Sequence, residues 1–120
     1  MPNKNEIHDF AVKYYNLYFC PQTALREVEK GFSEQCSALG FKMDCGKRFI
    51  GFFSNEAFYK NEELEKIINE IDDVDLLGSA IFSHWKAVTH WGYTDYLLDE
   101  NHRPWFITAF KRLVELTEII

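Results

Sequence analysis

The sequence predicts an all-α fold, a compact bundle of four to five helices that forms one domain over residues 1–120. The length of 120 residues suits a single domain, because the commonest domain size is about 100–150 residues. Apolar residues recur at three- and four-residue intervals over most of the chain, which is typical of amphipathic helices. No repeat, low-complexity tract or linker interrupts this pattern, so we expect no domain boundary.

The first helix is expected over residues 5–19. The spacing of Asn3 and Glu6 resembles a capping box, which would mark the start of this helix. Its apolar side is predicted to consist of Ile7, Ala11, Tyr15, Tyr18 and Phe19.

The second helix is expected from Pro21, a residue that suits the first turn of a helix, to about Leu39. Gly40 is expected to end it. The predicted apolar stripe has helical spacing and consists of Leu25, Val28, Phe32, Cys36 and Leu39.

Residues 41–54, FKMDCGKRFIGFFS, lack helical periodicity, and their two glycines disfavour a helix. We expect either a short β-ribbon or an irregular loop around residues 45–53. The run GKRFIGFF, residues 46–53, sets a basic pair beside aromatic rings, as in proteins that stack single-stranded nucleic acid. Its glycines do not fit the sheet-borne RNA-binding pattern, so we interpret the phenylalanines as core residues.

Three more helices are expected in the second half of the chain. The first covers about residues 56–71, with one face formed by Leu64, Ile67, Ile68 and Ile71. Asp75 is expected to cap the next helix, residues 76–91, which Gly92 would close. The last helix is expected from near Pro104 to the C-terminus, with an apolar face formed by Phe106, Ala109, Phe110, Leu113, Leu116 and Ile120.

The net charge of −6 is concentrated in NEELEKIINEIDDVD, residues 61–75, where seven carboxylates face only Lys66. The rest of the chain is balanced and has no basic block. This charge pattern argues against general nucleic-acid binding and against attachment to an anionic membrane. We interpret the segment as a solvated helix face; the alternatives are an acidic decoy for a DNA-binding protein or a surface for a basic partner.

Cys20, Cys36 and Cys45 form no CxxC motif, and each is interpreted as a small core residue. The start of the chain has no apolar signal core, so we expect a cytoplasmic protein with reduced thiols. No phosphate-binding loop, GxSxG motif or metalloenzyme spacing occurs, and we predict neither a metal nor a cofactor. Pairing of a cysteine with one of the four histidines in space stays open as a route to catalysis.

The segment FSHWKAVTHW, residues 82–91, contains two His-Trp pairs six residues apart. On a helical wheel His84 lies near the centre of the apolar face, and His90 lies about 120° away. A helical metal pair needs i, i+4 spacing, which these histidines lack. Two interpretations of His84 remain open: a hydrogen-bonded core residue, or a residue that lines a cavity beside Trp91.

The connection GYTDYLLDENHRP, residues 92–104, is longer than most helix–helix connections, which have about 2–8 residues. It is polar and rich in titratable groups, so it could form the rim of a pocket above an aromatic floor. A solvated loop whose Leu97 and Leu98 tuck into the core is the alternative. The candidate ligand or interaction residues are His84, Trp85, Trp91, Tyr93, Tyr96, His102 and Trp105.

Two segments, LLGSAIFSHWKAVTHWGY at residues 76–93 and RPWFITAFKRLVEL at residues 103–116, resemble a family of small uncharacterised bacterial proteins, a domain of unknown function. The family is associated with Firmicute genomes and mobile elements. The resemblance implies a bacterial cytosolic setting and assigns no catalytic residue.

The sequence therefore favours a binding or protein-interaction module with an aromatic-lined surface, whose partner is another protein or a second copy of the chain. A small-molecule binder or small enzyme centred on His84 is one alternative, and the acidic decoy is another. An enzymatic activity is left undecided, with the balance against it.

Overall fold

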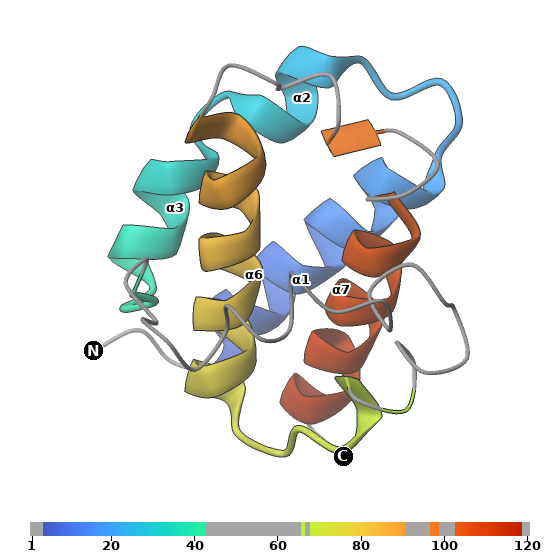
Figure 1. Ribbon diagram of the computed structural model, residues 1–120. Coiled ribbons are helices and arrows are strands. Elements are labelled where there is room, and N and C mark those ends of the chain that lie inside the picture. The colour runs from blue at the N-terminus through green and yellow to red at the C-terminus, as the bar shows by residue number, and fades with distance from the viewer. Residues whose placement is uncertain (1–3, 43–65, 67, 91–96, 99–102, 119–120) are drawn as a thin grey trace.

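The computed structural model describes residues 4–42, 66, 68–90, 97–98 and 103–118. These residues form an all-α fold, as the sequence predicted, with no strand among them. Figure 1 shows α3 and α6 side by side, with α7 on the other side of α6, α1 crossing behind and α2 above. The segments expected to form a β-ribbon at 45–53 and most of a helix at 56–71 lie outside the described residues.

Helices α1 (Lys4–Phe19) and α7 (Arg103–Thr117) pack more extensively than any other pair of the described helices. They are antiparallel, because the start of each lies beside the end of the other. At one end His8 Nδ1 and Thr117 Oγ1 are hydrogen-bonded at 3.0 Å. At the other end Arg103 Nε donates to the Tyr18 carbonyl at 2.7 Å, and so satisfies one of the carbonyls that the last turn of a helix leaves open.

Aromatic rings fill the space between α1 and the other helices. Phe110 of α7 has ring contacts with Phe10, Tyr14, Tyr18, Phe32 and Phe106, at centroid distances from 5.7 to 6.3 Å. The buried side of α1 consists of Ile7, Phe10, Ala11, Tyr14 and Tyr18. The predicted apolar side was therefore wrong at two positions, since Tyr15 is only half-buried and Phe19 is exposed.

The single helix expected between Pro21 and Leu39 is two short helices, α2 (Leu25–Glu29) and α3 (Phe32–Ala38). The break lies at Gly31, whose φ of 75° is a left-handed conformation that favours glycine. The predicted stop at Gly40 is confirmed: Gly40 N–H donates to the Ser37 carbonyl and Phe41 N–H to the Cys36 carbonyl, as in a Schellman motif. Most of the predicted stripe is buried despite the break, with Val28, Phe32, Cys36 and Leu39 in the core.

Helix α6 (Val74–His90) begins two residues before the predicted start. Its cap is Asp73, because Asp73 Oδ1 accepts hydrogen bonds from the backbone N–H groups of Asp75 and Leu76 at 2.9 and 3.2 Å. The expectation that Asp75 is the cap was therefore wrong. The prediction that His84 lies on the apolar face is confirmed, since His84 is buried together with Leu77, Ala80 and Ile81 of the same helix.

The start of α6 is tied to α7 through Arg112. Its Nε donates to the Ile71 carbonyl at 3.1 Å, and its Nη2 lies 2.8 Å from Asp72 Oδ1. The acidic segment thus has a structural attachment to the last helix at the residues before α6. Lys66, Ile68 and Asn69 are helical, which agrees with the end of the helix expected at 56–71.

Candidate functional site

His84 lies in the core where α6 meets α7. Its side chain is 2% exposed, and its ring stacks on Trp105 at 4.3 Å between centroids with an interplanar angle of 27°. The ring of Phe106 lies 5.1 Å away in a tilted arrangement. An imidazole packed against two aromatic rings contributes to packing in the same way as an apolar ring. This environment agrees with the interpretation of His84 as a core residue.

Trp85 connects α6 to α2 and α3. Its Nε1 donates to the Val28 carbonyl at 3.1 Å, and its ring stacks on Phe32 at 5.0 Å. This hydrogen bond is buried and joins residues 57 positions apart in the sequence. A buried hydrogen bond of this kind contributes about 1 kcal/mol, and leaving one partner unpaired costs more. The position of Trp85 is therefore explained by packing between α6 and α2.

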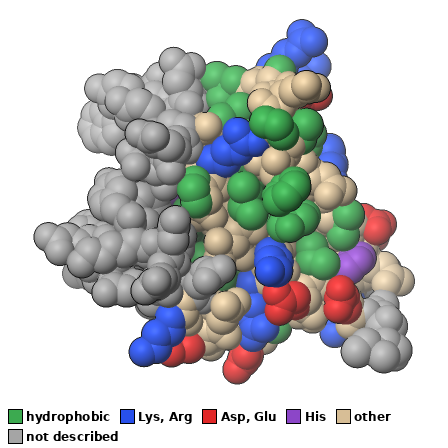
Figure 2. Space-filling model, turned by 90° about the vertical axis from the view of Figure 1, so that its right-hand side faces the viewer, with side chains coloured by type: hydrophobic (Ala, Val, Ile, Leu, Met, Phe, Trp, Pro, Cys, Tyr) green, Lys and Arg blue, Asp and Glu red, His purple; other side chains and the backbone are tan. Residues whose placement is uncertain are grey.

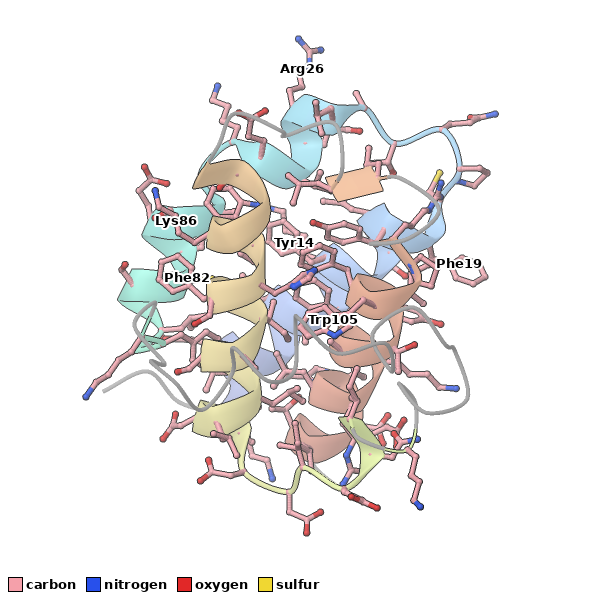
Figure 3. All side chains as sticks on the ribbon, in the orientation of Figure 1. Tyr14, Phe19, Arg26, Phe82, Lys86 and Trp105 are labelled. Carbon is pink, nitrogen blue, oxygen red and sulfur yellow. The ribbon has the colours of Figure 1, made fainter. Side chains whose placement is uncertain are left out.

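Trp105 is the third described member of the predicted aromatic surface, and it is buried among the helices (Figure 3). Its ring contacts His84 and Phe106. The remaining predicted site residues, Trp91, Tyr93, Tyr96 and His102, lie outside the described residues. The structure brings His84 and Trp105 together and places Trp85 on a different contact, and the pocket that the sequence suggested stays a prediction. Leu97, expected to tuck into the core if the connection is a plain loop, is fully buried.

The described carboxylates of the acidic segment are exposed, and two of them also form contacts that stabilise the fold. Glu70, Asp72, Asp73 and Asp75 are all exposed. However, Asp72 is paired with Arg112, and Asp73 caps α6. A DNA-mimicking ridge needs carboxylates free to face a basic partner, so these two aspartates fit that role poorly.

Burial decides the chemistry of the Cys36 thiol and the Tyr18 hydroxyl. It raises the pKa of the Cys36 thiol and, well above its ordinary value, the pKa of the Tyr18 hydroxyl. A thiol that stays protonated is a poor nucleophile, so Cys36 is unsuited to Cys-His catalysis. Cys20 is exposed, which makes the expectation of a core role wrong for this residue. Within the described parts of the chain, no three His, Cys, Asp or Glu side chains gather as metal ligands would.

The most exposed large apolar side chain that the structure describes is Phe19, at 63%. It lies at the last residue of α1, and its ring stacks on that of Tyr15 at 5.8 Å. Helical spacing places Val12, Tyr15 and Phe19 on the edge of α1 that also carries His8, and the His8–Thr117 contact shows that this edge faces α7. On α7, Ile107 and Val114 are half-buried, and their spacing of seven residues puts them on one line along the helix. We call these five residues the α1/α7 face.

Figure 2 looks at the side of the molecule where α7 and the end of α1 lie. Hydrophobic side chains gather in the middle of this side, with lysine, arginine and acidic side chains around and below them. This face was not predicted from the sequence, because the helical spacing grouped Tyr15 and Phe19 with the core residues of α1. The aromatic residues on two adjacent sides of α1 were the available signal, since a helix buries only one stripe against one neighbouring layer.

Comparison with known proteins adds no assignment: no family model matches the chain, and neither a curated protein nor a solved structure matches it. In the described residues no helix is both long enough and apolar enough to cross a membrane.

Proposed function

We propose that the protein is a protein-interaction module that associates with a second copy of itself through the α1/α7 face. The observation that carries this proposal is the exposure of Phe19, whose ring lies at the periphery of the molecule (Figure 3). Large exposed aromatic side chains that are rimmed by charge are typical of protein-binding surfaces. Tyr15 supports the ring from one side, so little conformational entropy is lost when a partner covers it.

A twofold arrangement suits this face, because the same patch is then buried on both copies. Two antiparallel helices from each copy would give a four-helix layer with a shared apolar seam. A standard interface buries about 800 Å² on each partner. That area is about a tenth of the accessible surface of 7394 Å², and α1, with 16 residues, is about 24 Å long.

Sedimentation velocity over a range of micromolar concentrations tests the proposal. The wild-type chain should sediment increasingly as a dimer as the concentration rises, and Phe19→Gln should shift the dissociation constant upward by about tenfold or more, as expected for an aromatic anchor. Ala38→Gln is the matched control, because it changes an exposed helical residue on α3, away from this face. A chain that stays monomeric throughout would refute self-association through the α1/α7 face.

The setting of the protein is also proposed as bacterial and cytoplasmic. Two features support it: the resemblance carried by residues 76–93 and 103–116, and the exposed free thiol of Cys20, which suits a reducing compartment. Fractionation of cells that express the protein would test it, and recovery outside the cytosol would contradict it.

A further inference from the structure

A groove runs along α1 on the side away from His8 and the α1/α7 face. One depression of about 370 Å³ lies between α1 and α3, and two of about 380 and 490 Å³ lie between α1 and the α2 region. Lys13 borders all three depressions, so they follow one another along the same helix. We call the whole the α1 groove. Its α1 members recur at helical intervals from Glu6 to Leu17, a span of about 17 Å.

Hydrogen bonds fix the far wall of the α1 groove. Gln35, which borders the α3 end, donates through Nε2 to Tyr14 Oη at 2.9 Å and to the Gly31 carbonyl at 3.1 Å. At the α2 end, Glu27 Oε2 accepts a hydrogen bond from the Ala24 N–H at 2.8 Å. A groove with fixed walls is already formed before a ligand arrives, which lowers the entropic cost of binding.

The floor of the groove is apolar. Phe10 and Leu39 line the α3 end, and Leu17 lines the α2 end. Side chains on α1 separated by seven residues lie on one line along the helix, as Phe10 and Leu17 do. Two apolar positions about 10 Å apart match the spacing of anchors at i and i+7 on an amphipathic helix.

The two ends of the groove carry opposite charge. At the α2 end, Lys13, Arg26 and Lys30 face the single carboxylate of Glu27, giving a local charge of +2 (three minus one) in a chain of net charge −6. Among the residues that the structure describes, none of these three cations forms an ion pair. Figure 3 shows Arg26 extending from α2 into solvent. At the α3 end, the acidic pair Glu6 and Asp9 is opposed by Lys13 alone.

We propose that the α1 groove binds an amphipathic segment of a partner protein, with apolar side chains over Phe10 and Leu17 and acidic side chains over Lys13, Arg26 and Lys30. Complementary charge selects such a partner and orients it along the groove. A nucleic-acid strand is uniformly negative, so Glu6 and Asp9 would repel one of its ends. This site is separate from the α1/α7 face and does not depend on self-association.

Fluorescence anisotropy with three labelled synthetic peptides tests the charge requirement. Each peptide has about 14 residues, long enough for the groove as a helix, with leucines at i, i+3 and i+7. One carries glutamates at a single end, one carries glutamines there, and one carries lysines. The full-length protein should bind the glutamate peptide most tightly, and rising salt should weaken that binding because exposed charges are screened. Equal binding of all three peptides would overturn the proposed charge selection.

Substitutions then test the location. Lys13→Glu combined with Lys30→Glu should weaken binding of the glutamate peptide by about tenfold, since reversing two rim charges changes the free energy by about 1.4 kcal/mol. The same pair should improve binding of the lysine peptide. Lys111→Glu is the matched control, because it reverses an exposed charge on α7 and should leave both affinities within about twofold.

Two outcomes would overturn the inference. If the glutamate peptide loses affinity with Phe19→Gln and keeps it with the double reversal, the peptide binds the α1/α7 face. If a single-stranded oligonucleotide displaces the glutamate peptide and binds more tightly than it does, the groove is a nucleic-acid site. If the wild-type chain stays monomeric but binds the glutamate peptide as expected, only the proposed self-association is refuted. Failure of the proposed function and failure of the groove proposal are therefore distinguishable.

Discussion

The two sides of α1 show how differently one helix can be held. Toward α7 the helix is fastened at both ends, by His8 with Thr117 and by Arg103 with the Tyr18 carbonyl, and stacked rings fill the contact between these ends. Toward α2 and α3 the helix meets two short helices, and Gln35 with Tyr14 is the side-chain hydrogen bond that the structure shows between them.

This difference explains where a groove can form. A partner helix of similar length covers α1 along most of its course, whereas helices of five and seven residues leave gaps beside it. Stability within a protein is uneven, and the less tightly packed side is the one that can open or accept a ligand. The contacts toward α7 therefore hold α1 in the fold, and the side toward α2 and α3 carries the depressions of the α1 groove.

Phe110→Ala should cause the largest loss of stability, because it removes the ring at the centre of the contact between α1 and α7. Phe110 is fully buried and has ring contacts with residues of α1, α3 and α7. Truncation of a buried phenylalanine costs about 3–5 kcal/mol, from lost burial and the cavity left behind. Urea denaturation measures this loss. A cost below about 1 kcal/mol would show that the aromatic layer does not hold α1 to α7.

How much of this arrangement the sequence could predict depends on whether the signal is local. The burial of Phe110 and His84 follows from helical spacing within one segment, and both were predicted to face inward. The break at Gly31 was missed because the apolar spacing of Val28, Phe32 and Cys36 continues across it without a change of period. A glycine within a regular stripe does not reveal a positive φ.

The candidate sites were harder to predict because they combine residues from separate helices. Which aromatic edge of α1 turns toward α7 depends on packing across some 100 residues of chain, as the His8–Thr117 contact shows. The α1 groove needs α1, α2 and α3 to be placed together before Lys13, Arg26 and Lys30 form a cluster. Neither the exposure of Phe19 nor the stacking of His84 on Trp105 can be predicted from any short segment of the sequence.

Alkaline pH should weaken the contact of α1 with α3, where Cys36 and Tyr14 are buried, and Tyr18, buried against α7, should add to the loss. Burial raises the pKa of all three groups. In the unfolded chain a thiol loses its proton near pH 8.5 and a tyrosine near pH 10, so above these values the unfolded state binds fewer protons than the folded state. Stability then falls as pH rises, by about 2–3 kcal/mol between pH 8 and 10, and is independent of these groups below about pH 7.

Urea denaturation across this pH range checks the alkaline loss. Cys36 contributes most of it, because its unfolded-state pKa is the lowest of the three. Cys36→Ala should therefore remove most of the decrease in stability between pH 8 and 10, whatever its effect on stability at neutral pH. An unchanged pH dependence in Cys36→Ala would show that this thiol is not protected by burial.

Tyr14 and Tyr18 give the smallest and sharpest test, since they are buried one turn apart on α1. The Tyr14 hydroxyl accepts a hydrogen bond from Gln35, whereas the Tyr18 hydroxyl has no partner among the described residues. Tyr14→Phe should cost about 1 kcal/mol in urea denaturation at neutral pH, because it leaves the Gln35 donor short of a partner. Tyr18→Phe should cost nothing or stabilise the protein slightly, because it removes a desolvated hydroxyl and retains the ring that stacks on Phe106. If Tyr18→Phe were the more costly change, the Tyr18 hydroxyl would have to form a stabilising hydrogen bond, and ring packing alone would not account for the contribution of Tyr18.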